Sequence, residues 1–295
     1  MFESLDSNKA MRGIEHRQGP LTVLTSVVLS YRDRRRAAVV QEIKDTALGR
    51  LVSDGPEALS LRAIARDMGL SVQSLYHYFA SRDHLITELV EDGHNGLADA
   101  LEAARDTHPV SARRDRLIAT SWAYRDWSVH HRREFQLIYG APIPDYHAPL
   151  TPNAAPVPAA ARIGGIFHSV VFADWTEEQL RAMPDEHVDS ALHAELAAAH
   201  QKFAPPGSAL PPAALHRFIR WWGQLHGLIT LEVFGHLHWL APDAGSIYRA
   251  AVLQQADEID AISSAAAARA GTCLPTMRLG RPITTEDVRS LEDEE

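Results

Sequence analysis

The side chains best suited to metal chemistry in this sequence gather late in the chain: His226, Glu232, His236 and His238. They fall on or near one expected helix, where Glu232 and His236 stand four residues apart and could ligate one ion together. The chain has a single cysteine, Cys273, and neither an HExxH nor a CxxC pattern. A metal- or haem-responsive site is therefore the alternative hypothesis, and we favour a buried, hydrogen-bonded packing role for His226.

The sequence lacks the patterns that usually mark the active site of an enzyme. It contains no P-loop, GxSxG or GxGxxG motif and no Cys/His nucleophile pattern. One cysteine cannot form an intrachain disulfide, which favours the reducing cytoplasm. No apolar run reaches the roughly 20 residues that a membrane span needs. We therefore expect a cytoplasmic protein that is not an enzyme, spans no membrane and needs no cofactor.

A second group of residues has the spacing of a helix-turn-helix, whose chemistry is the recognition of DNA. This motif needs a small residue where its two helices cross, and a glycine four residues on because the turn adopts a positive φ. It also needs an apolar residue six positions further, which buries the second helix. Ala65, Gly69 and Leu75 meet these requirements, and Ser60 and Ser71 precede the two helices as N-caps. The set therefore predicts a DNA-binding motif.

The elements that must position this motif are expected to be helices. Apolar residues recur every four positions from Val39 to Leu51, which predicts a helix over 33–54 that ends at Gly55-Pro56. Further helices are expected over 61–68, 72–79, 82–95, 97–106, 111–139, 159–172, 177–202 (with a break at Pro184 left open), 213–240 and 245–270. Neither a strand pattern nor an internal repeat stands out, so the predicted fold class is all-α.

Around the motif the sequence resembles the TetR family of regulators. The family pattern is an Ile-Ala pair, a Gly-Val-Ser-like turn, a Leu-Tyr-x-His-Phe segment and a Lys that opens the next helix. Over about residues 36–92 it reads here as Ile64-Ala65, Gly69-Leu70-Ser71, Leu75-Tyr76-His77-Tyr78-Phe79 and Arg82. Tyr78 replaces the usual His, and Gln73 stands where Gly or Pro is common, which affects base preference rather than fold.

A weaker resemblance extends into the rest of the chain. The segment from Tyr139 to Tyr146 with the Pro-rich loop after it, and the segment from Trp222 to Gly227 with Glu232, are similar to one actinobacterial type of TetR ligand domain. The resemblance implies a three-helix helix-turn-helix domain followed by a larger helical domain for ligand binding and dimerisation.

The resemblance also implies how the motif meets DNA. Arg62 matches a contact to bases or phosphate, and Gln73 and Ser74 would face base edges, where Gln suits N6 and N7 of adenine. Tyr76 and His77 match phosphate contacts, and Arg82 replaces a phosphate-binding Lys. The expected DNA-binding set is Arg62, Ser71, Gln73, Ser74, Tyr76, His77 and Arg82.

The charge distribution fits a chain of which only one part approaches DNA. The net charge is -9, which alone would not indicate a nucleic-acid binder. Residues 31–90 carry nine basic and eight acidic side chains and residues 1–30 carry three of each, so the negative charge lies beyond residue 90. Arg34, Arg35 and Arg36 form either a solvated face or an arm that follows the DNA backbone into the minor groove.

The aromatic and histidine residues beyond residue 110 suggest a pocket for a medium-sized, partly apolar small molecule. The expected pocket residues are Trp122, Trp127, Phe135, Phe167, Trp222 and His226. We expect the ligand between the fourth helix and the helices at 111–139 and 159–172, with the Pro-rich loop 140–158 closing over it. The alternative is that side chains fill this space and that the protein represses constitutively.

The expected organisation is an N-terminal tail at 1–32, a DNA-binding domain at 33–92, an effector-binding and dimerisation domain at 93–272 and an acidic tail at 273–295. The helices at 213–240 and 245–270 would pair with those of a second copy. The expected seam is Leu225, Leu228, Ile229, Glu232, Val252, Gln255 and Ile259. On family grounds we expect a homodimeric repressor of a palindromic operator, released by a small molecule.

Overall fold

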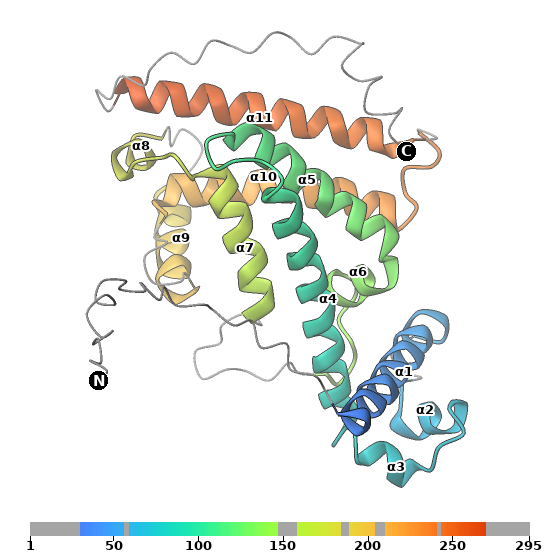
Figure 1. Cartoon of the computed structure of the whole chain (residues 1–295). Helices are drawn as coiled ribbons and strands as arrows, with labels where there is room; N and C mark the ends of the chain where they lie inside the picture. The colour runs from blue at the N-terminus through green and yellow to red at the C-terminus, as the bar shows by residue number, and fades with distance from the viewer. Residues whose placement is uncertain are drawn as a thin grey trace, which may run out of the picture. The chain divides into compact units, whose positions relative to one another are not determined.

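The computed structural model describes residues 30–55, 59–146, 158–183, 189–203, 210–240 and 243–269, and every regular element in these ranges is an α-helix (Figure 1). The helices are α1 Tyr31–Ser53, α2 Leu61–Asp67, α3 Val72–Tyr76, α4 Arg82–Arg105, α5 Arg113–His130, α6 Arg132–Tyr139, α7 Pro158–Val171, α8 Glu177–Arg181, α9 Ser190–Phe203, α10 Pro212–Val233 and α11 Ala244–Arg269. The all-α class is thus confirmed. No helix in these ranges is long and apolar enough to cross a membrane.

The chain divides into two units, Met1–Glu42 and Ile43–Glu295. The described part of the first unit is the exposed beginning of α1, which carries the arginines at 34–36. The second unit holds all the other helices. The predicted acidic tail and most of the Pro-rich loop lie outside the described residues, as does Pro184.

α4 is one continuous helix, so the predicted separate helices at 82–95 and 97–106 were wrong. The sequence contains Gly93 and Gly96 in this stretch, and Gly96 looked like a break. Instead, both glycines face neighbouring side chains: a Cβ on Gly93 would lie 3.0 Å from Ile138 Cγ2, and one on Gly96 would lie 3.6 Å from Trp127 Nε1. At Gly93 the helix tolerates the low helix propensity of glycine, about 1 kcal/mol, because a side chain there would crowd Ile138, whereas a Cβ at Gly96 would make only ordinary van der Waals contacts.

Further boundaries differ from the prediction: α3 ends at Tyr76 rather than at residue 79, and the helix expected over 177–202 is divided into α8 and α9. The single helix expected at 111–139 is two helices, α5 and α6, because His131 between them leaves the helical region with φ -112° and ψ 50°. The helix expected to run to residue 240 ends at Val233, and Gly235 just beyond it adopts a φ of +79°. This left-handed conformation favours glycine and commonly ends a helix.

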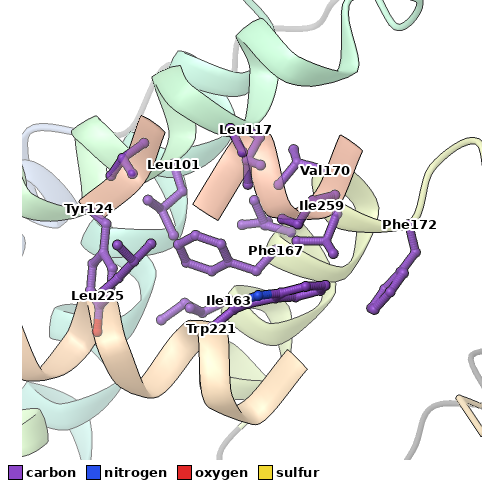
Figure 2. Close-up of a cluster of buried hydrophobic side chains, with 14 of the residues drawn as sticks. Leu101, Leu117, Tyr124, Ile163, Phe167, Val170, Phe172, Trp221, Leu225 and Ile259 are labelled. Carbon is purple, nitrogen blue, oxygen red and sulfur yellow. The ribbon is translucent and has the colours of Figure 1, made fainter. Parts of the chain in front are cut away.

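The second unit is organised around one large hydrophobic core. Figure 2 shows Leu101 of α4, Tyr124 of α5, Phe167 of α7 and Trp221 of α10 in the same cluster. Tyr124 and Trp221 are at most 1% exposed, and burial of each large side chain contributes roughly 1.5–3 kcal/mol to stability. The core therefore joins helices that lie more than a hundred residues apart in the sequence.

The same core corrects the predicted dimer seam. Leu225, Ile229, Val252, Gln255 and Ile259 are all between 0% and 4% exposed within the single chain. Glu232 accepts hydrogen bonds from Arg125 Nε at 2.8 Å and Nη2 at 2.5 Å in the same chain. Of the seven predicted seam residues, only Leu228 is a half-buried apolar side chain. α10 also carries exposed apolar residues, Ile219 and Leu231, on another face, whereas the sequence pattern alone pointed to the inner one.

The close contact at Gly93 leads to a stability prediction. Gly93→Leu should destabilise the protein by about 1–3 kcal/mol, because the added side chain must displace Ile138 and separate α6 from α4. Gly165→Leu is the matched control within α7, since nothing lies within 4 Å of a Cβ placed there. Its higher helix propensity should stabilise the protein by up to about 1 kcal/mol. Urea unfolding of both variants measures the difference, and equal effects would contradict the close packing at Gly93.

Candidate functional site

The turn between α2 and α3 has the geometry that the spacing predicts. Gly69 adopts a φ of +64°, and the Leu70 N–H donates to the Ala65 carbonyl at 2.8 Å. This bond closes the C-terminus of α2 as a Schellman motif, with Gly69 at the left-handed position. Another residue at that position would cost about 1–2 kcal/mol. The turn therefore fixes the angle at which α3 leaves α2.

α3 is short, and its two faces differ sharply. Ser71 caps it by accepting a hydrogen bond from the Ser74 N–H at 3.0 Å, and the two hydroxyl oxygens lie 2.7 Å apart. Leu75 on the inner face is fully buried, as is Phe79 just after the helix. Gln73 and Tyr76 are exposed on the other face. The helix is thus held by its apolar side and presents its polar side to solvent.

The remaining predicted DNA contacts lie close to this face in the sequence. Arg62 on α2 and His77 after α3 are exposed. Arg82 at the start of α4 is half-buried, because its Nε donates to the Leu59 carbonyl at 3.0 Å. Its Nη1 lies 3.6 Å from Asp83. Arg82 therefore ties the segment before α2 to α4, a structural role that its position in the family pattern did not indicate.

Ion pairs attach this motif to its neighbours. Lys44 of α1 is buried and lies 2.8 Å from Glu88 and 2.7 Å from Asp92 of α4. Burial alone would lower the pKa of Lys44, but the hydrogen bonds and charges of the two carboxylates raise it overall, so the ammonium stays charged. Arg50 donates to Asp67 of α2 at 2.5 Å. The helices around α3 are thus fixed by charge as well as by packing.

A cluster of aromatic and histidine rings lies among α5, α6 and α10. Tyr124 Oη is 2.6 Å from His226 Nδ1, and the His226 ring stacks on Trp222 with 4.6 Å between centroids. Tyr139 meets His226 edge-on at 4.7 Å, and Phe135 lies 5.8 Å away. Burial lowers the pKa of His226 and raises that of Tyr124, so both rings are neutral near pH 7.

A small cavity adjoins this cluster and is bounded by residues of α5, α7, α10 and α11. Its lining residues are Tyr124, Phe167, Val171, Phe218, Trp221, Trp222, Leu225 and Gln255. Its volume is about 10 Å³, which is space for about one water molecule. None of the lining residues comes from α4, so this cavity differs from the ligand site expected beside the fourth helix, which stays a prediction.

The structure separates the six residues expected to form a pocket. Phe167 and Trp222 line the cavity, and His226 and Phe135 lie beside it in the ring cluster. Trp127 instead stacks on His131 at 4.9 Å. Trp122 lies near the guanidinium groups of two arginines, with its ring centroid 5.2 Å from Arg125 Cζ and 5.3 Å from Arg249 Cζ.

Sequence reasoning missed the other cavity residues. Phe218 stands one helical turn before Trp222, so the helical period of α10 could have indicated it. Trp221 directly precedes Trp222 in the sequence. Tyr124 carried no distinguishing signal among the many aromatic residues. Gln255 was placed at the dimer seam, and only the structure shows that it faces the interior.

The residues of the metal hypothesis do not converge. Glu232 is engaged by Arg125 through two hydrogen bonds. Within the described ranges, no group of three or more His, Cys, Asp or Glu side chains is arranged to hold an ion. The structure therefore offers this hypothesis no specific support.

Comparison with known proteins agrees with this geometry. Residues 43–89 match the model of bacterial regulatory proteins of the tetR family, and residues 117–255 match the tetracyclin repressor-like C-terminal domain. HTH-type transcriptional regulators of Mycobacterium tuberculosis and Mycobacterium bovis are 35% identical over 204 residues, 68% of this chain and 84% of theirs. The crystal structure of a regulatory protein, SCO4313, is 31% identical, covers 77% of this chain and 98% of its own, and has a TM-score of 0.57. The chain therefore belongs to the TetR family of helix-turn-helix transcriptional regulators.

Proposed function

We propose that this chain is a homodimeric repressor that binds a palindromic operator and releases it when a small, mostly apolar molecule binds. The observation that carries the DNA-binding half is α3, whose polar face is exposed above the buried Leu75 and Phe79. In this proposal residues 33–92 form the DNA-binding domain and residues 93–272 bind the effector and the second subunit. The cavity beside the ring cluster supports the ligand-binding half.

The exposed side chains of the motif divide by the kind of DNA contact that they support. Gln73 can donate and accept in one plane, as adenine N7 and N6 require in the major groove. Tyr76, His77 and Arg62 carry donors suited to phosphate oxygens, which set register and affinity rather than sequence. Ser71 and Ser74 are engaged with each other at the start of α3, so their share in DNA contact would be through that capped end.

This division predicts different outcomes for two variants. Gln73→Ala should relax sequence preference at one base pair of each half-site, at a cost of about 1–3 kcal/mol. Tyr76→Phe, which removes only a hydroxyl, should weaken all sequences alike. Selection from a random duplex library with each purified variant, followed by binding titrations, measures both effects. An unchanged sequence preference in Gln73→Ala would show that α3 does not read bases through this residue.

The dimer half of the proposal rests on the outer face of α10. Ile219, Gly223, Gly227 and Leu231 recur every four residues, so they share one face of the helix. Ile219 and Leu231 are 47% and 40% exposed, and nothing lies within 4 Å of a Cβ placed on either glycine. An exposed apolar face with a flat glycine centre suits the close crossing of an identical helix. A twofold dimer in turn matches a palindromic operator.

Leu231→Glu should therefore convert the dimer to monomers. Two uncompensated carboxylates would be placed at the twofold contact, at a cost of about 3 kcal/mol or more. Val110→Glu is the control, because Val110 is 67% exposed in the segment between α4 and α5, away from this face. Sedimentation at micromolar concentration reads the outcome. A Leu231→Glu protein that still sediments as a dimer would place the interface elsewhere.

The release step rests on α6, which connects the ring cluster to α4. Tyr139 lies against His226 and also 6.0 Å from His94 of α4, centroid to centroid. Ile138 packs at Gly93, and Tyr146 Oη after α6 is 3.1 Å from Thr87 Oγ1 near the start of α4. Only five residues separate the end of α3 from the start of α4. A ligand that displaces the ring cluster would thus bias the position of α4, and through it α3.

The ligand-responsive proposal is tested by operator affinity with and without fractions of cellular small molecules. At least one fraction should weaken operator binding by the wild type, by the 5–150-fold that is usual for allosteric coupling. Phe167→Trp fills the cavity and should reduce this response while sparing affinity in its absence. Phe172→Trp, in the same core but outside the cavity lining, is the control. If no fraction changes the affinity of the wild type, the protein is a constitutive repressor.

A further inference from the structure

The cavity wall is uncharged. Seven of the eight lining side chains are aromatic or aliphatic, and the eighth is the neutral amide of Gln255. The aromatic rings are those of Tyr124, Phe167, Phe218, Trp221 and Trp222. Transfer of an ionic ligand into such a site would not be compensated by an opposite charge. The lining therefore favours a neutral molecule with a flat apolar surface.

Gln255 adds one polar requirement. Its side chain lines the cavity from α11 and the residue is only 4% exposed. Its Oε1 is buried, and no donor among the described residues reaches it. A buried carbonyl oxygen without a donor is unfavourable, and a bound molecule with an O–H or N–H group would satisfy it. The site thus combines an apolar wall with a single unmatched acceptor.

The size of the ligand follows from the side chains able to make room for it. The closed cavity holds about 10 Å³, so a ligand can enter only if part of the wall moves. Phe218 and Trp222 are the two half-buried lining residues, one turn apart on α10, and the other six are buried. Outward rotation of Trp222 would vacate the space of one indole ring system. It would also remove the ring on which His226 stacks. His226 belongs to the ring cluster that contacts α6 through Tyr139.

We propose that this cavity binds a neutral aromatic molecule of one or two fused rings with one hydrogen-bond donor, a phenol or an indole, whose donor bonds to Gln255 Oε1. The inference rests on the proposed ligand-responsive function and specifies the chemical class of its effector.

The test uses the full-length protein without DNA and three matched probes. 2-Naphthol carries the donor, 2-methoxynaphthalene has the same rings without it, and 2-naphthoate carries a charge. In isothermal titration calorimetry we expect 2-naphthol to bind with at least about 10-fold higher affinity than 2-methoxynaphthalene, because only it satisfies the buried acceptor. 2-Naphthoate should not bind detectably. Equal binding of the first two probes, or tighter binding of the anion, would overturn the proposal.

Two glutamines next to each other in the sequence supply the variant and its control. Gln255→Leu removes the acceptor from the cavity and should lower the affinity for 2-naphthol to the level of 2-methoxynaphthalene. Gln254→Leu makes the same chemical change on the exposed face of α11 and should keep the wild-type preference. Thermal unfolding of both variants verifies that they fold. A preference for 2-naphthol that survives Gln255→Leu would show that another group accepts the bond.

The outcome is separable from that of the proposed function. Binding of the probes is measured without DNA, whereas release is measured on the operator. Donor-dependent binding without any effect of small molecules on operator affinity would retain the cavity chemistry and reject the ligand-released repressor. If cellular fractions weaken operator binding but the probes bind without dependence on the donor, the ligand-released repressor is retained and the cavity chemistry is rejected.

Discussion

The continuity of α4 is the constraint on which the rest of this structure depends. Its first three turns bind α1 through the ion pairs of Lys44 with Glu88 and Asp92, and bind the segment before α2 through the hydrogen bond from Arg82 to the Leu59 carbonyl. Its last turns place Leu97, Ala98 and Leu101 in the hydrophobic core of the C-terminal helices. α4 therefore packs both against the DNA-binding helices and into the core of the C-terminal helices.

One glycine of α4 has a physical purpose in this arrangement. Gly93 lets α6 approach the helix backbone closely, so that α6 lies between α4 and the rings around His226. Tyr139 contacts histidines on both sides. Burial lowers the pKa of both His94 and His226, which keeps this contact free of charge near pH 7. The contacts from the ring cluster through Tyr139 to α4 are therefore packing contacts between neutral rings rather than ion pairs.

The sequence was informative where local chemistry decides the structure. The N-cap serines, the left-handed Gly69 and the buried Leu75 act within a few residues of each other, so the motif could be predicted from their spacing. The all-α class followed from the apolar periods. Prediction failed where a distant partner decides the outcome. Gly96 was expected to break the helix, but it lies within α4 and faces Trp127 of α5. Leu225 was expected at the dimer interface, but it is buried in the core of its own chain.

The cavity illustrates the same limit. An excess of aromatic residues indicated a pocket in the C-terminal domain, but which rings converge depends on how α5, α7, α10 and α11 pack. Trp122 and Trp222 are alike in sequence, yet one lies near arginines and the other lines the cavity. The helical period placed Gln255 on an apolar face with Val252 and Ile259, but it could not show that this face lines a cavity within the chain.

The central claim is that the cavity side and the DNA-binding side of the chain are coupled through α6 and α4. Coupling between binding sites is reciprocal, so under the proposed function operator binding would itself alter the cavity side, whatever the effector is. Amide hydrogen exchange of the full-length protein, with and without a duplex selected for tight binding, measures this directly. The account predicts slower or faster exchange in α6 and in the segment up to Tyr146, in addition to protection of α2 and α3. Changes confined to α2 and α3 would contradict it.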